Sequence, residues 1–393
     1  MALLLKDSFA AQSALDLTSS WARDLRLKLN VGDDKTAALC GPSGCPSPTP
    51  LSVDGVPLPW VTTYRYLGGL LHCAGSVRPM LKDLDLRLTK RTGMFVRWGR
   101  ASQIAIAILA KLFIIYLEPV ALSLLAAVPL NASDLVHIDM LQRKLARMVL
   151  GHCKYSPIPS PLLLLGWCSW SAMLPSLRAG LLLHAHSGLP SMLTLLCKFG
   201  PQCEGTWYYQ ACLGVTGSEG IAPIRDHHKL LRASLTRARE LDWARLVRVA
   251  EAHSNLCHFP VLLANRLGAG SCLAGEFTSP RVPLSTSLLV MRLCSGGQSL
   301  RGGDRARVGP PLIRSLCAFC SGFGGQVPED LQHFLLECPL TDGPRRHLHS
   351  SVKQLLLEPW NHRVGKQSHR TQAMAVSAQM WQVRKAWIRQ QSK

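Results

Sequence analysis

The sequence predicts a mostly α-helical protein with a small α+β segment at its N-terminal end and a small metal-binding knuckle near its C-terminal end. Three observations lead to this fold class. Apolar stretches with helical periodicity fill the middle of the chain, short segments separated by Gly and Pro precede them, and a Cys/His set with zinc-ligand spacing follows. The hydrophobic share of 47% is enough for packed cores and excludes a wholly disordered chain.

The N-terminal segment combines a helix with short strands. Residues 3–22 are typical of a helix, and residues 25–31 alternate apolar and polar side chains, which is the period of a half-buried strand. The Gly-Asp-Asp at residues 32–34 predicts a turn, after which residues 35–39 can return as a second strand. A Pro-rich linker follows at residues 41–50.

The most apolar stretch, residues 101–130, predicts two buried helices in place of a membrane span. Lys111 and Glu118 lie inside it and Pro119 interrupts it, so no uncharged run reaches the roughly 18 residues that a spanning helix needs. We therefore expect no membrane partner. The expected parts of the chain are residues 1–76 (α+β segment), 77–190 (helical domain), 191–300 (helical linker region), 301–345 (knuckle) and 346–393 (basic helical tail).

The charge balance predicts a polyanionic partner. The chain carries 44 Lys and Arg against 24 Asp and Glu, a net charge of +20, which favours nucleic acid as the first candidate partner and an anionic membrane surface as the second. Residues 225–248 form a basic helix in this interpretation. The 14 cysteines alone could indicate a disulfide scaffold, but the N-terminus lacks the basic and apolar regions of a secretory signal. We expect a nuclear or cytoplasmic protein that is not secreted, with reduced thiols.

A single Cys/His set has the spacing of a structural zinc site. Cys317 and Cys320 are separated by two residues, which aims both thiolates at one point, and His333 and Cys338 follow. Four such ligands satisfy the tetrahedral demand of structural Zn²⁺. The alternative is four unrelated residues in a cysteine-rich chain.

Basic residues around the knuckle and in the tail are candidate phosphate contacts, since phosphate neutralisation dominates nucleic-acid affinity. Trp381 and Trp387 interleave with the basic residues of the tail, and could either stack on unpaired bases or form an apolar stripe of the core. The candidate phosphate contacts are Arg301, Arg305, Arg307, Arg345, Arg346, Arg384, Lys385 and Arg389.

Three segments resemble the C-terminal part of non-LTR (LINE-type) retrotransposon reverse transcriptases. Residues 21–39, with Trp, Leu-x-Leu-Asn and Lys-Thr, are similar to the segment after the catalytic box. Val-Asp-Gly-Val-Pro-Leu-Pro at residues 53–59 and the turn that follows resemble the primer grip, and residues 292–339 resemble the C-terminal CCHC knuckle. The resemblance implies that the primer-grip residues are Tyr66, Leu67, Gly68 and Gly69.

This resemblance implies a palm remnant, a helical thumb over residues 77–190 and an RNA-directed DNA polymerase function that grips primer–template and element RNA. It makes Lys35 a general-acid candidate, although contact with backbone or phosphate is the alternative for this chain. The Asp pair that binds Mg²⁺ would directly precede residue 1, so we expect Mg²⁺ only in a complete enzyme and a truncated, inactive polymerase here. The pair Asp33-Asp34 is better explained as a polar turn. The alternatives are a zinc-dependent RNA/DNA-binding protein without catalysis and a non-functional relic.

Overall fold

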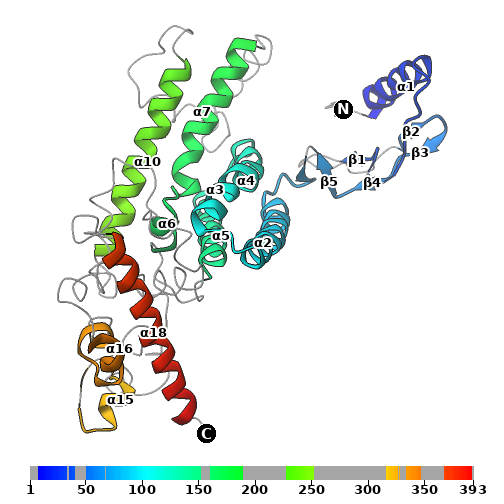
Figure 1. Cartoon of the computed structure of the whole chain (residues 1–393). Helices are drawn as coiled ribbons and strands as arrows, with labels where there is room; N and C mark the ends of the chain where they lie inside the picture. Colours follow the sequence, from blue (N-terminus) through cyan, green and yellow to red (C-terminus); the bar gives the residue numbers. More distant parts are fainter. Residues whose placement is uncertain are drawn as a thin grey trace.

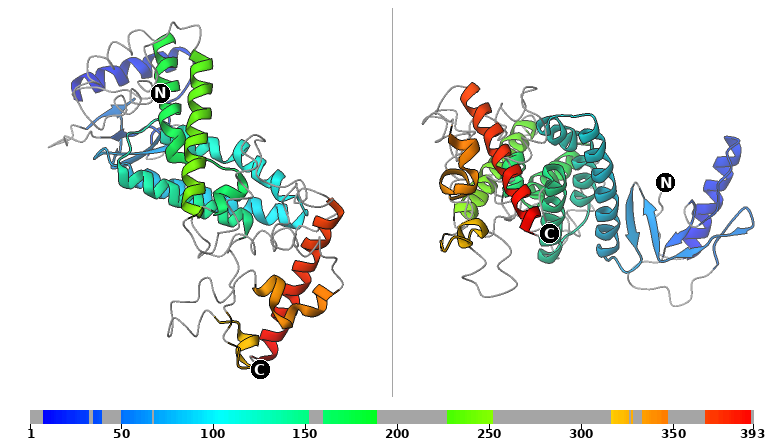
Figure 2. Two further views of the ribbon diagram at one scale, coloured as in Figure 1. Left: turned by 90° about the vertical axis from the view of Figure 1, so that its left-hand side faces the viewer. Right: turned by 60° about the horizontal axis from the view of Figure 1, so that its bottom comes forward.

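The computed structural model describes residues 8–32, 35–39, 50–66, 68–151, 160–188, 227–251, 316–325, 327, 333–346 and 367–391. Most of these residues are helical and the strands are short, which confirms the mostly α fold class. The N-terminal strands lie to one side of a packed group of helices (Figures 1 and 2). Of the expected linker region at residues 191–300, the structure describes residues 227–251.

The N-terminal unit is a helix packed on short strands. Its elements are α1 (Ser8–Asp24), β1 (Ala38–Leu39), β2 (Ser52–Val53), β3 (Val56–Pro57) and β4 (Trp60–Val61). The β2–β3 hairpin turns at Asp54 and Gly55, which both have positive φ, as a type I′ turn requires. Gln12 of α1 binds this hairpin twice, since its side chain donates to the Ser52 carbonyl at 2.9 Å and accepts from the Ser52 N–H at 3.0 Å.

The strand expected at residues 25–31 is wrong, because these residues terminate α1 instead. The Leu27 N–H donates to Ala22 O and the Arg26 N–H to Arg23 O, both at 2.8 Å, while Arg26 has a φ of 57°. This is a Schellman cap, which uses the first residues of the supposed strand. Only an isolated parallel bridge joins Val31 to Thr36, and β1 pairs in parallel with β4.

A second hairpin connects the N-terminal unit to the helices. Strands β5 (Thr63–Tyr66) and β6 (Gly69–His72) are antiparallel, and Gly68, at φ 84°, lies in the two-residue loop between them. Leu67 lies outside the described residues. The Arg65 guanidinium binds both carboxylate oxygens of Asp83, at 2.8 and 3.1 Å. This bidentate pair fixes the hairpin to the first long helix.

The helical body forms one hydrophobic core. Its helices are α2 (Arg78–Ala101), α3 (Ile106–Tyr116), α4 (Glu118–Ala126), α5 (Ala132–Leu150), α6 (Ser160–Leu165), α7 (Trp170–Gly188) and α10 (His227–Glu251). The Asn131–Asp134 capping box starts α5, and Gly151 ends it in the left-handed conformation. Helices α7 and α10 lie side by side (Figures 1 and 2).

The apolar stretch at residues 101–130 forms two helices, as predicted. Leu117 separates α3 from α4, and a proline occupies the first turn of α4, where its missing N–H does no harm. Phe113 is fully buried and stacks on Trp167 with 4.3 Å between ring centroids. Within the described residues, Ile108–Ala126 is long and apolar enough by composition to cross a membrane. The absence of a membrane partner stays a prediction.

Buried polar groups attach α10 to the turn before α7. The Asp242 carboxylate accepts a hydrogen bond from the Ser169 N–H at 2.7 Å and is paired with Arg245 at 2.6 Å. Gln142 of α5 bonds the same turn on both sides, since it donates to Cys168 O at 2.8 Å and accepts from the Trp170 N–H at 2.9 Å. These contacts satisfy the backbone of a buried turn, so we interpret them as structural.

Two glycines of α2 provide a matched test of the core. A Cβ at Gly99 would overlap the Leu109 side chain, whereas one at Gly93 would lie an ordinary 3.6 Å from Met148 Cε. We expect Gly93→Ala to raise the free energy of unfolding by about 0.5–1 kcal/mol, because it removes glycine from a helix. Gly99→Ala is expected to lower it by about 1–3 kcal/mol through overpacking. Urea unfolding measures both, and equal effects would contradict this packing.

Candidate metal centre and basic surfaces

Four side chains from two separate segments converge on one point near the C-terminal end. Cys317 is the N-cap of the single turn α15 (Ala318–Ser321) and Cys320 lies within this turn, while His333 begins the π-helical turn η3 (His333–Glu337) and Cys338 follows η3 directly. All four residues are buried, and their ligand atoms all lie within 4.8 Å of one another. The structure therefore brings together the set that spacing predicts, in a cluster that can hold a metal ion.

The distances within the cluster fit a tetrahedral ion. Cys317 Sγ lies 3.8 Å from Cys338 Sγ, and Cys320 Sγ lies 3.4 Å from His333 Nε2. Ligands about 2.3 Å (sulfur) or 2.1 Å (nitrogen) from a tetrahedral zinc lie about 3.4–3.8 Å from one another. A disulfide would need sulfurs about 2 Å apart, so the thiols are not bonded to each other. A donor set of three sulfurs and one imidazole is typical of structural zinc sites.

A glycine-rich turn shapes the first half of the cluster. The N–H groups of Phe323 and Gly325 both donate to Cys320 O, at 3.1 and 2.9 Å. Gly324 has a φ of 82°, and a Cβ at Gly325 would approach Cys320 O to 3.2 Å. The chain can reverse this tightly after Cys320 because these positions are glycine.

The Cys317 thiol loses its proton more readily than an ordinary cysteine does, which favours cation binding at the cluster. A hydrogen bond from the Cys338 thiol, together with bonds from nearby backbone N–H groups, lowers the pKa of Cys317 to about 5. The same hydrogen bond and burial raise the pKa of Cys338. A metal ion bound by these two sulfurs would displace a proton from the pair. His333 Nδ1 lies 3.6 Å from Glu337 Oε2, which leaves Nε2 directed at Cys320.

Arg345 is buried in the knuckle and binds backbone carbonyls beside the metal-ligand cluster. It is 7% exposed, and its guanidinium donates to Leu335 O at 3.3 Å and to Cys338 O at 3.1 Å. Arg345 was expected to contact phosphate, but in this structure its donors are directed at the backbone of the cluster. Arg346, its neighbour in α16 (Asp342–Arg346), is exposed and pairs with Asp342 at 2.7 Å.

Helix α18 (Gln367–Gln391) packs along the knuckle, so the two form one unit, the knuckle module, with the described residues 316–325, 327, 333–346 and 367–391. Figures 1 and 2 show α15 and α16 beside this helix. Trp381 is buried, and its ring meets the Phe334 ring edge-on with 5.9 Å between the ring centroids. Of the two roles considered for Trp381, base stacking and core packing, the structure therefore supports core packing. The Arg384 side chain is buried, and the central carbon of its guanidinium group lies 5.0 Å from the centre of the Trp381 ring.

The remaining candidates are separate from the cluster. Lys35 is exposed, and its carbonyl accepts a hydrogen bond from the Tyr64 hydroxyl. Lys385 is exposed on α18, and Arg389 belongs to the same helix. Three candidates lie outside the described residues: Arg301, Arg305 and Arg307.

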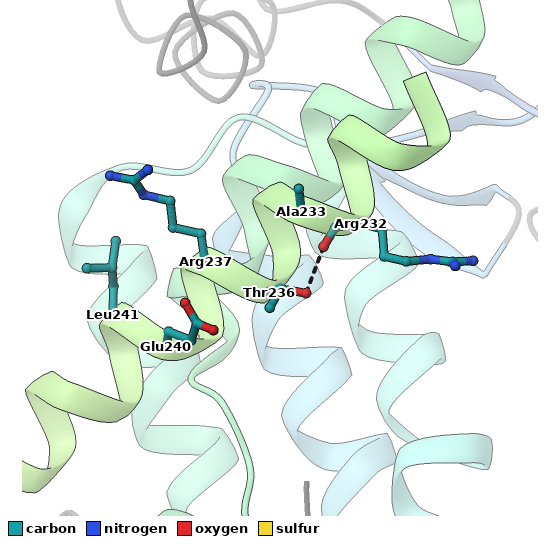
Figure 3. Close-up of a pocket in the computed structure, with 6 residues that line it drawn as sticks. All are labelled: Arg232, Ala233, Thr236, Arg237, Glu240 and Leu241. Atoms are coloured by element: carbon teal, nitrogen blue, oxygen red, sulfur yellow. Dashed lines mark hydrogen bonds between the residues drawn. The ribbon is translucent and has the colours of Figure 1, made fainter. Parts of the chain in front are cut away.

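The predicted basic helix at residues 225–248 is α10, whose outer surface bears an open hollow lined by this helix alone. Figure 3 shows that Arg232 and Arg237 point away from each other there, while the Thr236 hydroxyl donates to Arg232 O at 2.9 Å. Glu240 shares the hollow and offsets part of the positive charge. The lining side chains do not converge on a common point, so the hollow has no evident chemistry.

Sequence reasoning missed a second basic surface, on α2. Lys82, Leu86, Lys90, Met94 and Trp98 recur every four residues and all are exposed, so they lie along one side of the helix. Two further exposed cations, Arg91 and Arg97, lie beside this line. Neither these two arginines nor the two lysines of the line form an ion pair with a described residue. We define the α2 face as Lys82, Lys90, Arg91 and Arg97 with Leu86, Met94 and Trp98.

Comparisons with known proteins give no relative: no protein-family model matches the chain, and a search of curated proteins finds no match.

Proposed function

We propose that this chain is a zinc-stabilised nucleic-acid-binding protein that acts as the post-catalytic part of a LINE-type reverse transcriptase. The α2 face carries the proposal. It presents four exposed cations along one helix, interleaved with an exposed tryptophan, methionine and leucine. Cations neutralise phosphates, and an exposed indole ring can stack on a base or pack on a sugar. The net charge of +20 supports the same partner.

The neighbouring hairpin supports the more specific role. The β5–β6 turn resembles a primer grip, and the Arg65–Asp83 pair attaches this hairpin to the same helix that bears the α2 face. Gly69 packs closely on α4, since a Cβ there would lie 3.2 Å from Leu124 Cδ2. We propose that hairpin and helix contact one primer–template duplex as a rigid pair. Element RNA would be a further ligand of the basic surfaces.

In this proposal the knuckle holds structural zinc through Cys317, Cys320, His333 and Cys338. The ion would displace a proton from the cluster and fix the glycine-rich turn, without taking part in a reaction. Mg²⁺ has no role in this proposal, because the α2 face and the knuckle would act by binding nucleic acid and not by catalysis.

The double variant Lys90→Ala/Arg91→Ala tests the α2 face. We expect it to weaken binding to an RNA–DNA hybrid and to make the slope of log Kobs against log salt shallower by about 1.4–1.8, because two phosphate contacts are lost. The measurement is fluorescence anisotropy of a labelled hybrid over a salt series.

The matched control is Arg23→Ala/Lys28→Ala, which removes the same charge from exposed residues of the N-terminal unit. If both double variants change the slope equally, the effect is one of overall charge and the α2 face is not the interface. Primer extension above background that Asp33→Ala/Asp34→Ala abolishes would contradict the non-catalytic role.

A further inference from the structure

Three aromatic rings gather at the tip of the knuckle module. Phe319, between the first two cysteines, lies 5.1 Å from Phe323 and 5.7 Å from Trp387 of α18. Phe319 and Trp387 are half-buried, whereas Phe323 is 80% exposed. The Phe319 ring is tilted against Phe323 on one side and meets Trp387 edge-on on another, so Phe319 supports one side of Phe323 while most of the Phe323 surface faces solvent.

The backbone holds Phe323 in this exposed position. Its N–H donates to Cys320 O at 3.1 Å, and the preceding Gly322 N–H donates to Phe319 O at 3.2 Å. The next residue, Gly324, has a φ of 82°. The ring therefore projects from a turn that the metal ligands and hydrogen bonds define. Unlike a singly exposed apolar side chain, the Phe323 ring belongs to a cluster of three aromatic rings on an ordered turn, which makes it a candidate contact surface.

The net charge of the C-terminal segment indicates which partner the rings fit. Residues 341–393 contain ten Lys or Arg and two acidic residues. Arg346 and Lys385, which belong to the elements packed on the knuckle, are exposed. A positively charged module that presents an aromatic ring matches a single strand, whose bases offer π-faces and whose phosphates are anionic. An uncharged apolar protein surface would not use this charge.

We propose that Phe323, supported by Phe319, which Trp387 contacts in turn, is a stacking platform for an unpaired base of single-stranded RNA or DNA. This inference rests on the proposed function and extends it from duplex contact at the α2 face to single-strand contact at the knuckle. Stacking depends on the π-face of the base, so the platform binds all four bases and gives little sequence preference.

The test compares Phe323→Ala with Phe9→Ala in the full zinc-loaded chain. Phe9 lies on α1 and is 82% exposed, so its removal matches the loss of an exposed phenyl ring elsewhere. The probes are a labelled oligoadenylate and an abasic strand of the same length. We expect Phe323→Ala to bind the oligoadenylate about 5- to 100-fold more weakly and the abasic strand unchanged. Phe323→Tyr keeps a ring and is expected to bind like the parent.

The other outcomes separate the two proposals. If the parent chain binds the oligoadenylate and Phe323→Ala binds it equally well, the platform is refuted while the proposed function stands. A parallel loss on both strands, with zinc content retained, also refutes stacking. Self-association that Phe323→Ala abolishes without changing oligoadenylate binding would assign the ring to a protein contact. If the parent binds neither strand nor an RNA–DNA hybrid, the proposed function fails as well.

Discussion

The variant Cys320→Ser is expected to lose stoichiometric zinc and to unfold the knuckle module. Zinc binding to small knuckles is worth about 10–16 kcal/mol of apparent free energy, and much of this energy orders the chain around the metal. Besides the ligands, the larger apolar side chains that are buried in the described part of the knuckle module are few, so this small core replaces little of the metal's contribution: Phe334, Leu335, Val376, Met380 and Trp381. The measurements are zinc content per chain and amide hydrogen exchange.

Exchange should locate the effect. The Cys338 N–H, bonded to His333 O at 2.7 Å, and the Thr341 N–H, bonded to Cys338 O at 3.1 Å, are expected to lose protection. The amides of α5 should keep theirs, because the helical body has its own core. The control is Cys73→Ser, whose thiol lies outside the cluster. A Cys320→Ser protein that retains zinc and knuckle protection would show that the cluster is not a metal site.

The largest stability loss is expected from Phe113→Ala. Phe113 is fully buried and stacked on Trp167, so truncation removes a large apolar side chain and leaves a cavity. Such changes cost about 3–5 kcal/mol of unfolding free energy, and the lost ring contact adds about 0.5–1.5 kcal/mol. Urea unfolding monitored by helical circular dichroism provides the measurement.

The control for this prediction lies on the same helix. Ile115 is 60% exposed, and Ile115→Ala is expected to change the unfolding free energy by about 0.5 kcal/mol or less. The pair therefore distinguishes a helix that packs one face into a protein core from a helix whose apolar residues face lipid. Equal losses at both positions would contradict the packed body that the structure describes.

The sequence predicts the metal cluster and the helices because both depend on local spacing. Two cysteines with two residues between them, followed by a His and a Cys, specify a tetrahedral set wherever the intervening chain can reverse, and glycines 322, 324 and 325 allow the reversal. The break at Leu117 follows from Pro119, and the end of α5 coincides with Gly151. Each of these features lies within a few residues of its cause.

Other features depend on contacts that spacing does not encode. The alternation at residues 25–31 is typical of a strand, yet the Schellman cap at Arg26 uses its first residues and leaves Leu25 and Leu27 exposed. Arg345 looks like a surface cation until the carbonyls of Leu335 and Cys338 are placed around it. Both outcomes follow from backbone groups that need partners, and periodicity counts only side chains.

The α2 face shows a related limit. Leu86, Met94 and Trp98 are apolar at helical spacing, which is also the pattern of a core stripe. The helix has a second apolar line, with Leu84 and Leu88 fully buried, and it is this second line that faces the core. Which line is buried is decided by the neighbouring helices, so only the structure identifies the exposed one.

The central claim is that this zinc-stabilised chain binds nucleic acid through exposed cations. Its most direct test is the salt dependence of RNA–DNA hybrid binding by the zinc-loaded parent chain. Four phosphate contacts from the α2 face predict a slope of log Kobs against log salt of about −3, or steeper if other basic surfaces contribute. Absence of binding at low salt, or a slope near zero, would contradict the claim.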